Sequence, residues 1–114
     1  MNAAILTNEF PPEIYGGAGI HVKFLTQELA KLCHIEARCF GVQNVDENNI
    51  HALGFSRKLG LNPEDDRFQK IFKPLDIDLQ WAASLKDIDV IHCHTWYSHF
   101  GGVLASRLLQ CPLI

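Results

Sequence analysis

Short apolar runs alternate along this chain with segments of helical periodicity, and that alternation restricts the fold more than any other feature. Residues 3–7 are almost wholly apolar, as expected of a strand buried on both faces of a parallel sheet. Similar runs at residues 35–40 and Val90–Cys93 predict two more strands, and Ile50–Phe55 predicts a weaker one. Strands that alternate with helices predict an α/β fold with a Rossmann-like, doubly wound parallel sheet.

Three segments predict the helices that connect these strands. Residues 20–32 carry apolar side chains at helical spacing, which predicts one stripe packed on the sheet. The members of this stripe are Ile20, Phe24, Leu25, Leu29 and Leu32. Residues 78–85 predict a short helix, with Asp76 or Asp78 accepting hydrogen bonds from its first turn. Residues 100–108 predict the last helix, whereas residues 41–74 show little periodicity outside the weak strand.

The chain stops at Leu113 and Ile114, an apolar pair that follows Pro112 and has the pattern of another buried strand. An ending on the first residues of a strand predicts that these 114 residues are part of a larger domain.

Charge and cysteine content narrow the functional classes. Thirteen acidic against ten basic side chains give no field that would gather nucleic acid or an anionic membrane, so neither partner is expected. No run approaches the roughly 20 apolar residues of a membrane helix, and the N-terminus lacks the pattern of a signal peptide. The four cysteines form no Cys-x-x-Cys pair, which predicts reduced thiols and a cytoplasmic protein.

A glycine-rich segment, Gly16, Gly17, Ala18 and Gly19, follows the first predicted strand and opens the first helix. Its backbone amides and the positive end of the helix dipole could hold a phosphate or diphosphate. The dinucleotide fingerprint is incomplete, because Val22 stands where a third glycine is needed. An alternative, equally compatible with the segment alone, is that the glycines only allow the helix to pack closely on the strand.

Two histidines flank a cysteine at the end of the strand Val90–Cys93, which raises the question of a metal site. In an extended strand His92 and His94 share one face and Cys93 points to the other, so no metal is expected here. His94, just past the strand, is better placed to exchange one hydrogen bond with a ligand hydroxyl. Of its neighbours Thr95, Trp96 and Tyr97, the two aromatic residues could stack on a sugar or simply cap the core.

The loops after the first strand and after Val90–Cys93 are expected to meet, because these strands are neighbours in the usual strand order. Their carboxyl ends then form the switch point at which open α/β sheets bind ligands. Glu9 and Glu13 of the first loop could bind substrate hydroxyls or remain solvated. The basic pair Arg57 and Lys58 could reach a phosphate or lie free on the surface.

Two stretches carry a family resemblance, residues 9–22 (EFPPEIYGGAGIHV) and residues 89–97 (DVIHCHTWY). With them the chain resembles the retaining glycosyltransferases of the GT-B fold, close to glycogen synthases and maltose-1-phosphate synthases, over nearly its whole length. The resemblance implies that residues 1–114 are part of the N-terminal, acceptor-side Rossmann-like domain of such a glycosyltransferase. The C-terminal nucleotide-sugar domain is absent from this sequence.

The resemblance also implies a reaction: transfer of glucose with retention from a nucleotide-sugar donor, ADP-glucose or UDP-glucose, in glycogen biosynthesis. The acceptor would be an α-1,4-glucan or glucose 1-phosphate, and no metal or other cofactor is needed. It places Gly16, Gly17 and Gly19 near the donor diphosphate, and His94 beside the donor sugar as the catalytic residue.

One position departs from a main branch of the family, because Ile14 stands where those synthases carry a lysine. The missing C-terminal domain would then supply the positive charge, and the fragment alone should not turn over substrate. A phosphate- or sugar-binding module without catalysis is the alternative, and a purely structural domain is another.

Overall fold

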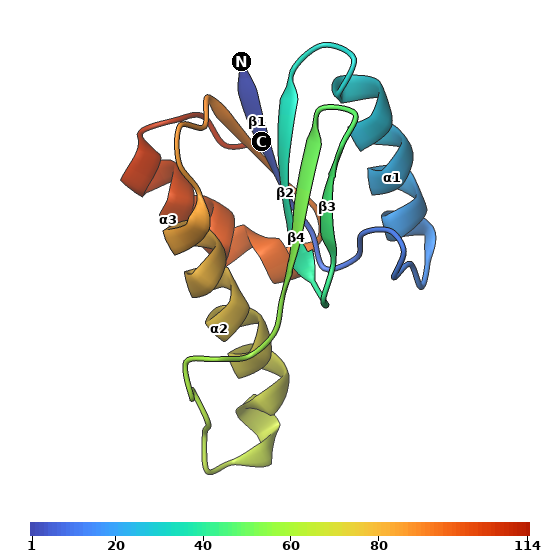
Figure 1. The fold of residues 1–114 in the computed structure, drawn as a ribbon. Helices are drawn as coiled ribbons and strands as arrows, with labels where there is room; N and C mark the ends of the chain where they lie inside the picture. The colour runs from blue at the N-terminus through green and yellow to red at the C-terminus, as the bar shows by residue number, and fades with distance from the viewer.

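Five strands form one sheet in the order β3-β4-β2-β1-β5 (Figure 1). The computed structural model describes residues 1–114. The strands are β1 (Asn2–Leu6), β2 (His34–Phe40), β3 (Asn44–Glu47), β4 (Ile50–Phe55) and β5 (Val90–Cys93). All are parallel except β3, which pairs with β4 in the antiparallel sense at the edge. The expected neighbourhood of the first strand and Val90–Cys93 is confirmed, since Leu6 pairs with Cys93.

Helices cover both faces of the sheet, which confirms the doubly wound, Rossmann-like α/β fold. The α-helices are α1 (Gly17–Leu29), α2 (Gln69–Ser84) and α3 (His99–Leu109), and two 3-10 turns are η1 (Asp66–Phe68) and η2 (Trp96–Ser98). Helix α1 lies on one face, and α2 and α3 lie together on the other (Figure 1). None of the helices combines the length and apolar character needed to cross a membrane.

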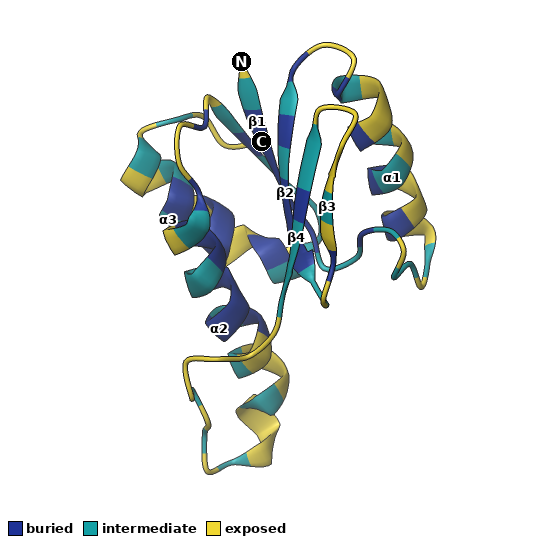
Figure 2. Cartoon of the chain, in the orientation of Figure 1, coloured by how far each residue is buried: buried dark blue, intermediate teal, exposed yellow.

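The core is divided by the sheet into two layers, because successive strand side chains point to opposite faces. From β1, Ala3 and Ile5 belong to the cluster beneath α1, whereas Ala4 and Leu6 belong to the cluster beneath α2 and α3. Figure 2 shows the resulting buried centre of the sheet and the exposed outer sides of the helices.

The buried face of α1 differs from the predicted stripe. Gly19, Val22 and Thr26 are the buried residues of this helix, whereas Ile20 and Phe24 are 51% and 58% exposed. The contact row is made of small or short side chains that let the helix approach the sheet closely, so hydrophobicity alone selected the wrong face. The helix also begins and ends three residues earlier than expected.

In the middle of the chain the predicted start of one helix was wrong, and one strand was missed. The helix expected at residues 78–85 begins at Gln69 and contains Pro74, and the polar edge strand β3 was not predicted. Asp76 therefore lies inside the helix and does not cap it. Its carboxylate accepts hydrogen bonds from the amides of Lys58 (3.1 Å) and Leu59 (3.0 Å), which fixes the loop after β4 to α2.

The last two residues continue the sheet beside β5, as the strand pattern predicts. The Ile114 amide donates to the Ile91 carbonyl at 2.8 Å, and Leu113 forms a parallel bridge with Ile91. They are not buried as predicted, because Leu113 and Ile114 are both exposed.

Candidate functional site

The loops that follow β1 and β5 meet at the carboxyl edge of the parallel strands, which is the lower edge of the sheet in Figure 1. The Thr95 hydroxyl donates to Asn8 Oδ1 at 3.1 Å, and the His94 amide donates to the Leu6 carbonyl at 2.9 Å. His21 of α1 reaches the same place, with its ring centroid 5.6 Å from that of His94. The structure thus brings the glycine segment and the histidine segment to one side of the sheet edge.

The glycine segment is the first turn of α1 and not a separate loop. Gly16 is the N-cap residue with extended backbone, and no side chain caps the helix. The amides of Gly17, Ala18 and Gly19 donate no hydrogen bond within the chain. Gly17 and Ala18 are exposed, so their amides and the helix dipole can receive an anion from solvent.

The Glu9 side chain fixes the backbone at the start of this turn. Its Oε2 accepts hydrogen bonds from the amides of Tyr15 (3.0 Å) and Gly16 (3.1 Å). A Cβ atom at position 19 would collide with the Glu9 carboxylate and approach Ile14 Cγ2 to 2.9 Å. Close packing therefore explains Gly19, whereas the open amides are at Gly17 and Ala18.

The His94 ring is half-buried beside two other histidines. Its centroid lies 4.3 Å from that of His92, and its Nε2 is buried without a hydrogen-bond partner. Burial, with smaller contributions from His92 and His21, lowers the pKa of His94 to about 4. The ring is thus neutral at pH 7, with one nitrogen that donates and one that accepts.

The residues of β5 alternate across the sheet. Cys93 points away from the two histidines, toward α3, where its Sγ donates to the Ser98 carbonyl at 3.3 Å. Burial raises the pKa of the Cys93 thiol to about 11, so it stays protonated. No group of three or more His, Cys, Asp or Glu side chains is arranged to hold a metal ion.

The segment after His94 is sharply bent. Thr95 has φ 68° and ψ 161°, a conformation that β-branched residues rarely adopt. The Ser98 hydroxyl stabilises the bend by donating to the carbonyls of His94 (2.9 Å) and Thr95 (3.0 Å). Trp96 is 54% exposed and stacks on Tyr97 at 4.2 Å, so it does not cap the core.

Glu13 is not brought to His94. It lies beside Gly41 and Gln43, at the turn after β2, and no hydrogen bond links it to the histidine segment.

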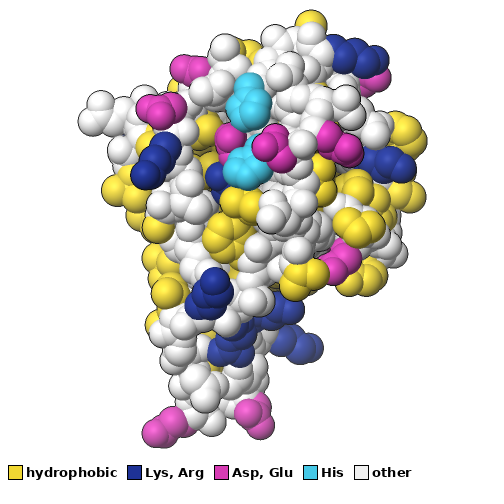
Figure 3. Space-filling view, viewed as in Figure 1, with side chains coloured by type: hydrophobic (Ala, Val, Ile, Leu, Met, Phe, Trp, Pro, Cys, Tyr) yellow, Lys and Arg dark blue, Asp and Glu magenta, His cyan; other side chains and the backbone are white.

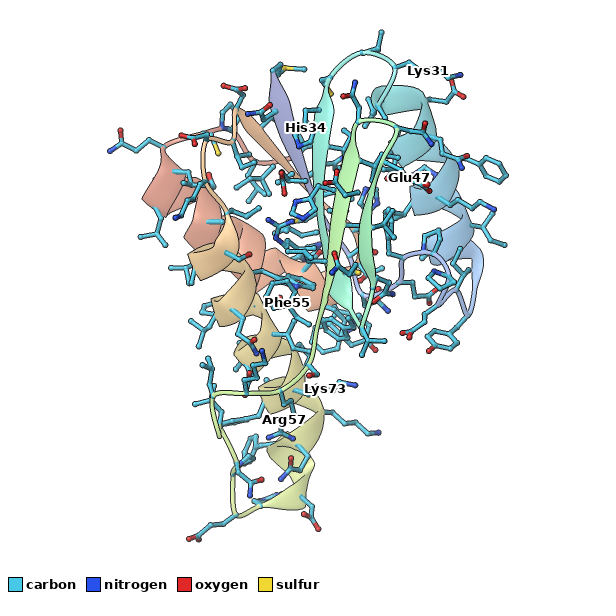
Figure 4. All side chains as sticks on the ribbon, viewed as in Figure 1. Lys31, His34, Glu47, Phe55, Arg57 and Lys73 are labelled. Carbon is cyan, nitrogen blue, oxygen red and sulfur yellow. The ribbon has the colours of Figure 1, made fainter.

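A pocket of about 480 Å³ opens beside Trp96 and Tyr97, between the sheet edge and the first turns of α2. We call it the basic pocket; its lining residues are Asn8, Phe40, Arg57, Gln69, Lys70, Lys73, Pro74, Trp96 and Tyr97. Figure 4 labels Arg57 and Lys73, which lie close together where β4 leads toward α2. Sequence reasoning considered Arg57 but missed the lysines. The i, i+3 spacing of Lys70 and Lys73 would have placed both side chains on one helix face, if the predicted helix had been extended toward the N-terminus through Pro74.

A second cavity, of about 510 Å³, lies between α1 and the edge strand β3. It contains none of the residues predicted for the site, and Lys31 on its rim is already paired with Glu28 at 2.7 Å.

Comparison with known proteins fits this arrangement. The model of Glycosyltransferase Family 4 matches residues 15–114. The chain is 34% identical over 112 residues to the alpha-maltose-1-phosphate synthase of Mycolicibacterium smegmatis, and 35% identical to that of Mycobacterium tuberculosis. An uncharacterized glycosyltransferase of Methanocaldococcus jannaschii is 27% identical over 116 residues, which is 30% of its length.

The synthase matches cover 98% of this chain and 27% of each synthase, so the chain spans about a quarter of the length of these relatives. The fold, the position of the two loops and the family match over most of the chain agree. This chain belongs to glycosyltransferase family 4.

Proposed function

We propose that this chain is the N-terminal, acceptor-side domain of a hexosyltransferase of the glycogen synthase and maltose-1-phosphate synthase type. The enzyme transfers glucose with retention from ADP-glucose or UDP-glucose to an α-1,4-glucan or to glucose 1-phosphate. The mycobacterial relatives are named for maltose 1-phosphate, the product that glucosyl transfer to glucose 1-phosphate would form, and this name supports the sugar-phosphate acceptor. The four thiols, all free in the structure, are compatible with a cytoplasmic enzyme.

The observation that carries the proposal is the meeting of unpaired amides and a neutral imidazole at one sheet edge. The amides of Gly17 and Ala18 have no partner in the chain and would bind the anionic oxygens of the donor diphosphate. His94 would exchange a hydrogen bond with a hydroxyl of the donor sugar, because its Nε2 has no partner and its pKa of about 4 keeps it neutral.

Four of the remaining candidates have a defined part in this proposal, and Glu13 has none. Thr95 fixes the bend through Asn8, and the exposed face of Trp96 with Tyr97 offers a stacking surface for a sugar ring. Glu9 acts through the loop that it holds, by positioning the turn at Gly16.

Turnover requires a second domain that faces this edge of the sheet. Ile14 supplies no charge near the glycine turn, so the phosphates need cations from the C-terminal domain of the longer enzyme. We therefore expect the 114-residue chain to be inactive alone.

The test is release of ADP from ADP-glucose by the full-length protein, with UDP-glucose run in parallel. A maltooligosaccharide and glucose 1-phosphate are compared as acceptors, and a reaction without acceptor is the blank. Acceptor-dependent release is expected. The absence of release with every donor and acceptor, combined with binding of a sugar or phosphate by the chain alone, would favour the non-catalytic binding module instead.

A further inference from the structure

The basic pocket is the most strongly charged concave surface of the chain that the proposed function leaves unassigned. Three of its lining side chains are cations, Arg57, Lys70 and Lys73, and none of them forms an ion pair with a carboxylate. Figure 3 shows Lys and Arg side chains gathered on the lower part of the molecule, beneath the sheet. Unpaired cations that converge on a pocket favour an anionic occupant.

Hydrogen bonds fix the position of Arg57 in the basic pocket. Asp76 holds the loop after β4 through the amides of Lys58 and Leu59, and this anchoring fixes the adjacent Arg57 against α2. The Arg57 guanidinium donates to Gln69 Oε1 at 3.0 Å and also to the Leu61 carbonyl. These bonds orient it without neutralising its charge. Asp76 accepts a third hydrogen bond, from the side-chain amide of Gln80 to its Oδ1 at 2.8 Å.

The other wall of the pocket is aromatic. The Lys73 ammonium lies 5.6 Å from the centroid of Phe40, and Phe40 packs edge-on against Tyr97 at 5.9 Å. Tyr97 in turn stacks with the exposed Trp96. Asn8, whose Oδ1 binds Thr95, joins the same wall to the segment of His94. Cations on one side and aromatic faces on the other suit a ligand with a phosphate at one end and a sugar ring at the other.

We infer that the basic pocket binds the phosphate of a sugar-phosphate acceptor, with Lys70, Lys73 and Arg57 contacting the phosphate oxygens. This inference rests on the proposed glucosyl transfer and selects a phosphorylated acceptor over a neutral glucan. The donor diphosphate is the other possible source of phosphate. It is assigned elsewhere, because the open amides of α1 lie on the opposite face of the sheet from α2 (Figure 1).

The experiment uses the full-length protein and the variants Lys73→Gln and Lys70→Gln. Lys86→Gln is the matched control, since Lys86 is exposed beyond the other end of α2 and the substitution removes the same charge. Loss of one charge-assisted hydrogen bond should raise KM for glucose 1-phosphate about tenfold or more in the pocket variants. The KM for the nucleotide-sugar donor, activity on a maltooligosaccharide, and the control should change less than about twofold.

Three other results overturn the inference. An equal rise of KM for the donor assigns the pocket to the donor diphosphate, and a rise for the neutral glucan assigns it to sugar binding without phosphate. Unchanged KM values in both variants show that no phosphate binds there. If the wild type transfers no glucose, the proposed function fails separately. Calorimetric titration with glucose 1-phosphate then tests the basic pocket on its own. Binding that is weakened by Lys73→Gln but not by Lys86→Gln supports the inference, and any other pattern rejects it.

Discussion

The buried carboxyl of Asp78 should make the stability of this fold fall as the pH rises. Asp78 lies between α2 and α3 and is 1% exposed, and its Oδ1 has no hydrogen-bond partner. Desolvation raises the pKa of this carboxyl from 3.8 to about 7, and the amide of Gly101 offsets only part of the shift. The folded protein therefore keeps a proton that the unfolded chain releases near pH 4.

The size of the effect follows from the shift. Each pKa unit corresponds to roughly 1.4 kcal/mol, so a rise to about 7 amounts to about 4 kcal/mol of unfolding free energy. Below pH 4 the Asp78 carboxyl is protonated in both states and costs nothing. Between pH 4 and pH 7 the free energy of unfolding falls as the unfolded state ionises, and above pH 7 the loss is complete.

The variant Asp78→Asn keeps the shape and removes the titration. Urea unfolding of the 114-residue chain, followed by circular dichroism at pH 4 and pH 8, should give similar stabilities at the lower pH. At pH 8 the variant should be more stable by up to about 4 kcal/mol. Other titrating groups cancel, because both proteins contain them. Asp46→Asn, on the exposed edge strand, is the control for the loss of one surface carboxylate. A difference between Asp78→Asn and the wild type that is equal at both pH values would refute the reasoning.

Substitutions at three other positions test the site and the core. His94→Ala should lower turnover of the full-length enzyme at least tenfold, about 1.4 kcal/mol, while a thermal melt changes little; unfolding with activity retained per folded molecule would contradict this role. Gly19→Ala should displace the Glu9 carboxylate and raise KM for the donor; an unaltered donor KM would disprove the link. Trp81→Phe should lower the free energy of unfolding by less than about 1 kcal/mol, because the buried indole Nε1 has no hydrogen-bond partner, whereas Trp81→Ala should lower it by about 3–5 kcal/mol in urea unfolding. Equal losses of stability in the two variants would show that the indole nitrogen matters.

The sequence predicts the central strands well, because a strand buried on both faces must be a continuous apolar run. Residues 3–7 and Val90–Cys93 have that pattern, and their adjacency follows from the usual order of a doubly wound sheet. The meeting of the two loops was predictable for the same reason, since neighbouring parallel strands end at one edge.

The buried face of α1, the start of α2 and the surroundings of His94 depend on tertiary contacts that the sequence pattern does not show. Close approach selected Gly19, Val22 and Thr26 as the buried row of α1, although Ile20 and Phe24 are more apolar. The first turns of α2 were missed because Pro74 favours a helix boundary, and with them the lysines of the basic pocket. The environment of the His94 ring could not be predicted either, because the nearness of His21 depends on how α1 packs on the sheet.

The anchoring of the loop after β4 has a consequence for how this fold can diversify. Asp76 holds one end at Lys58 and Leu59, and Asp65 holds the other by accepting the Arg67 amide at 2.9 Å. The stretch 60–64 between these fixed points can change length at a modest entropic cost, because loop closure depends only weakly on length. Insertions there would reshape the mouth of the basic pocket while the sheet, the glycine turn and His94 stay in place. Under the proposed function, preference for an acceptor would then change independently of the residues proposed to bind the donor.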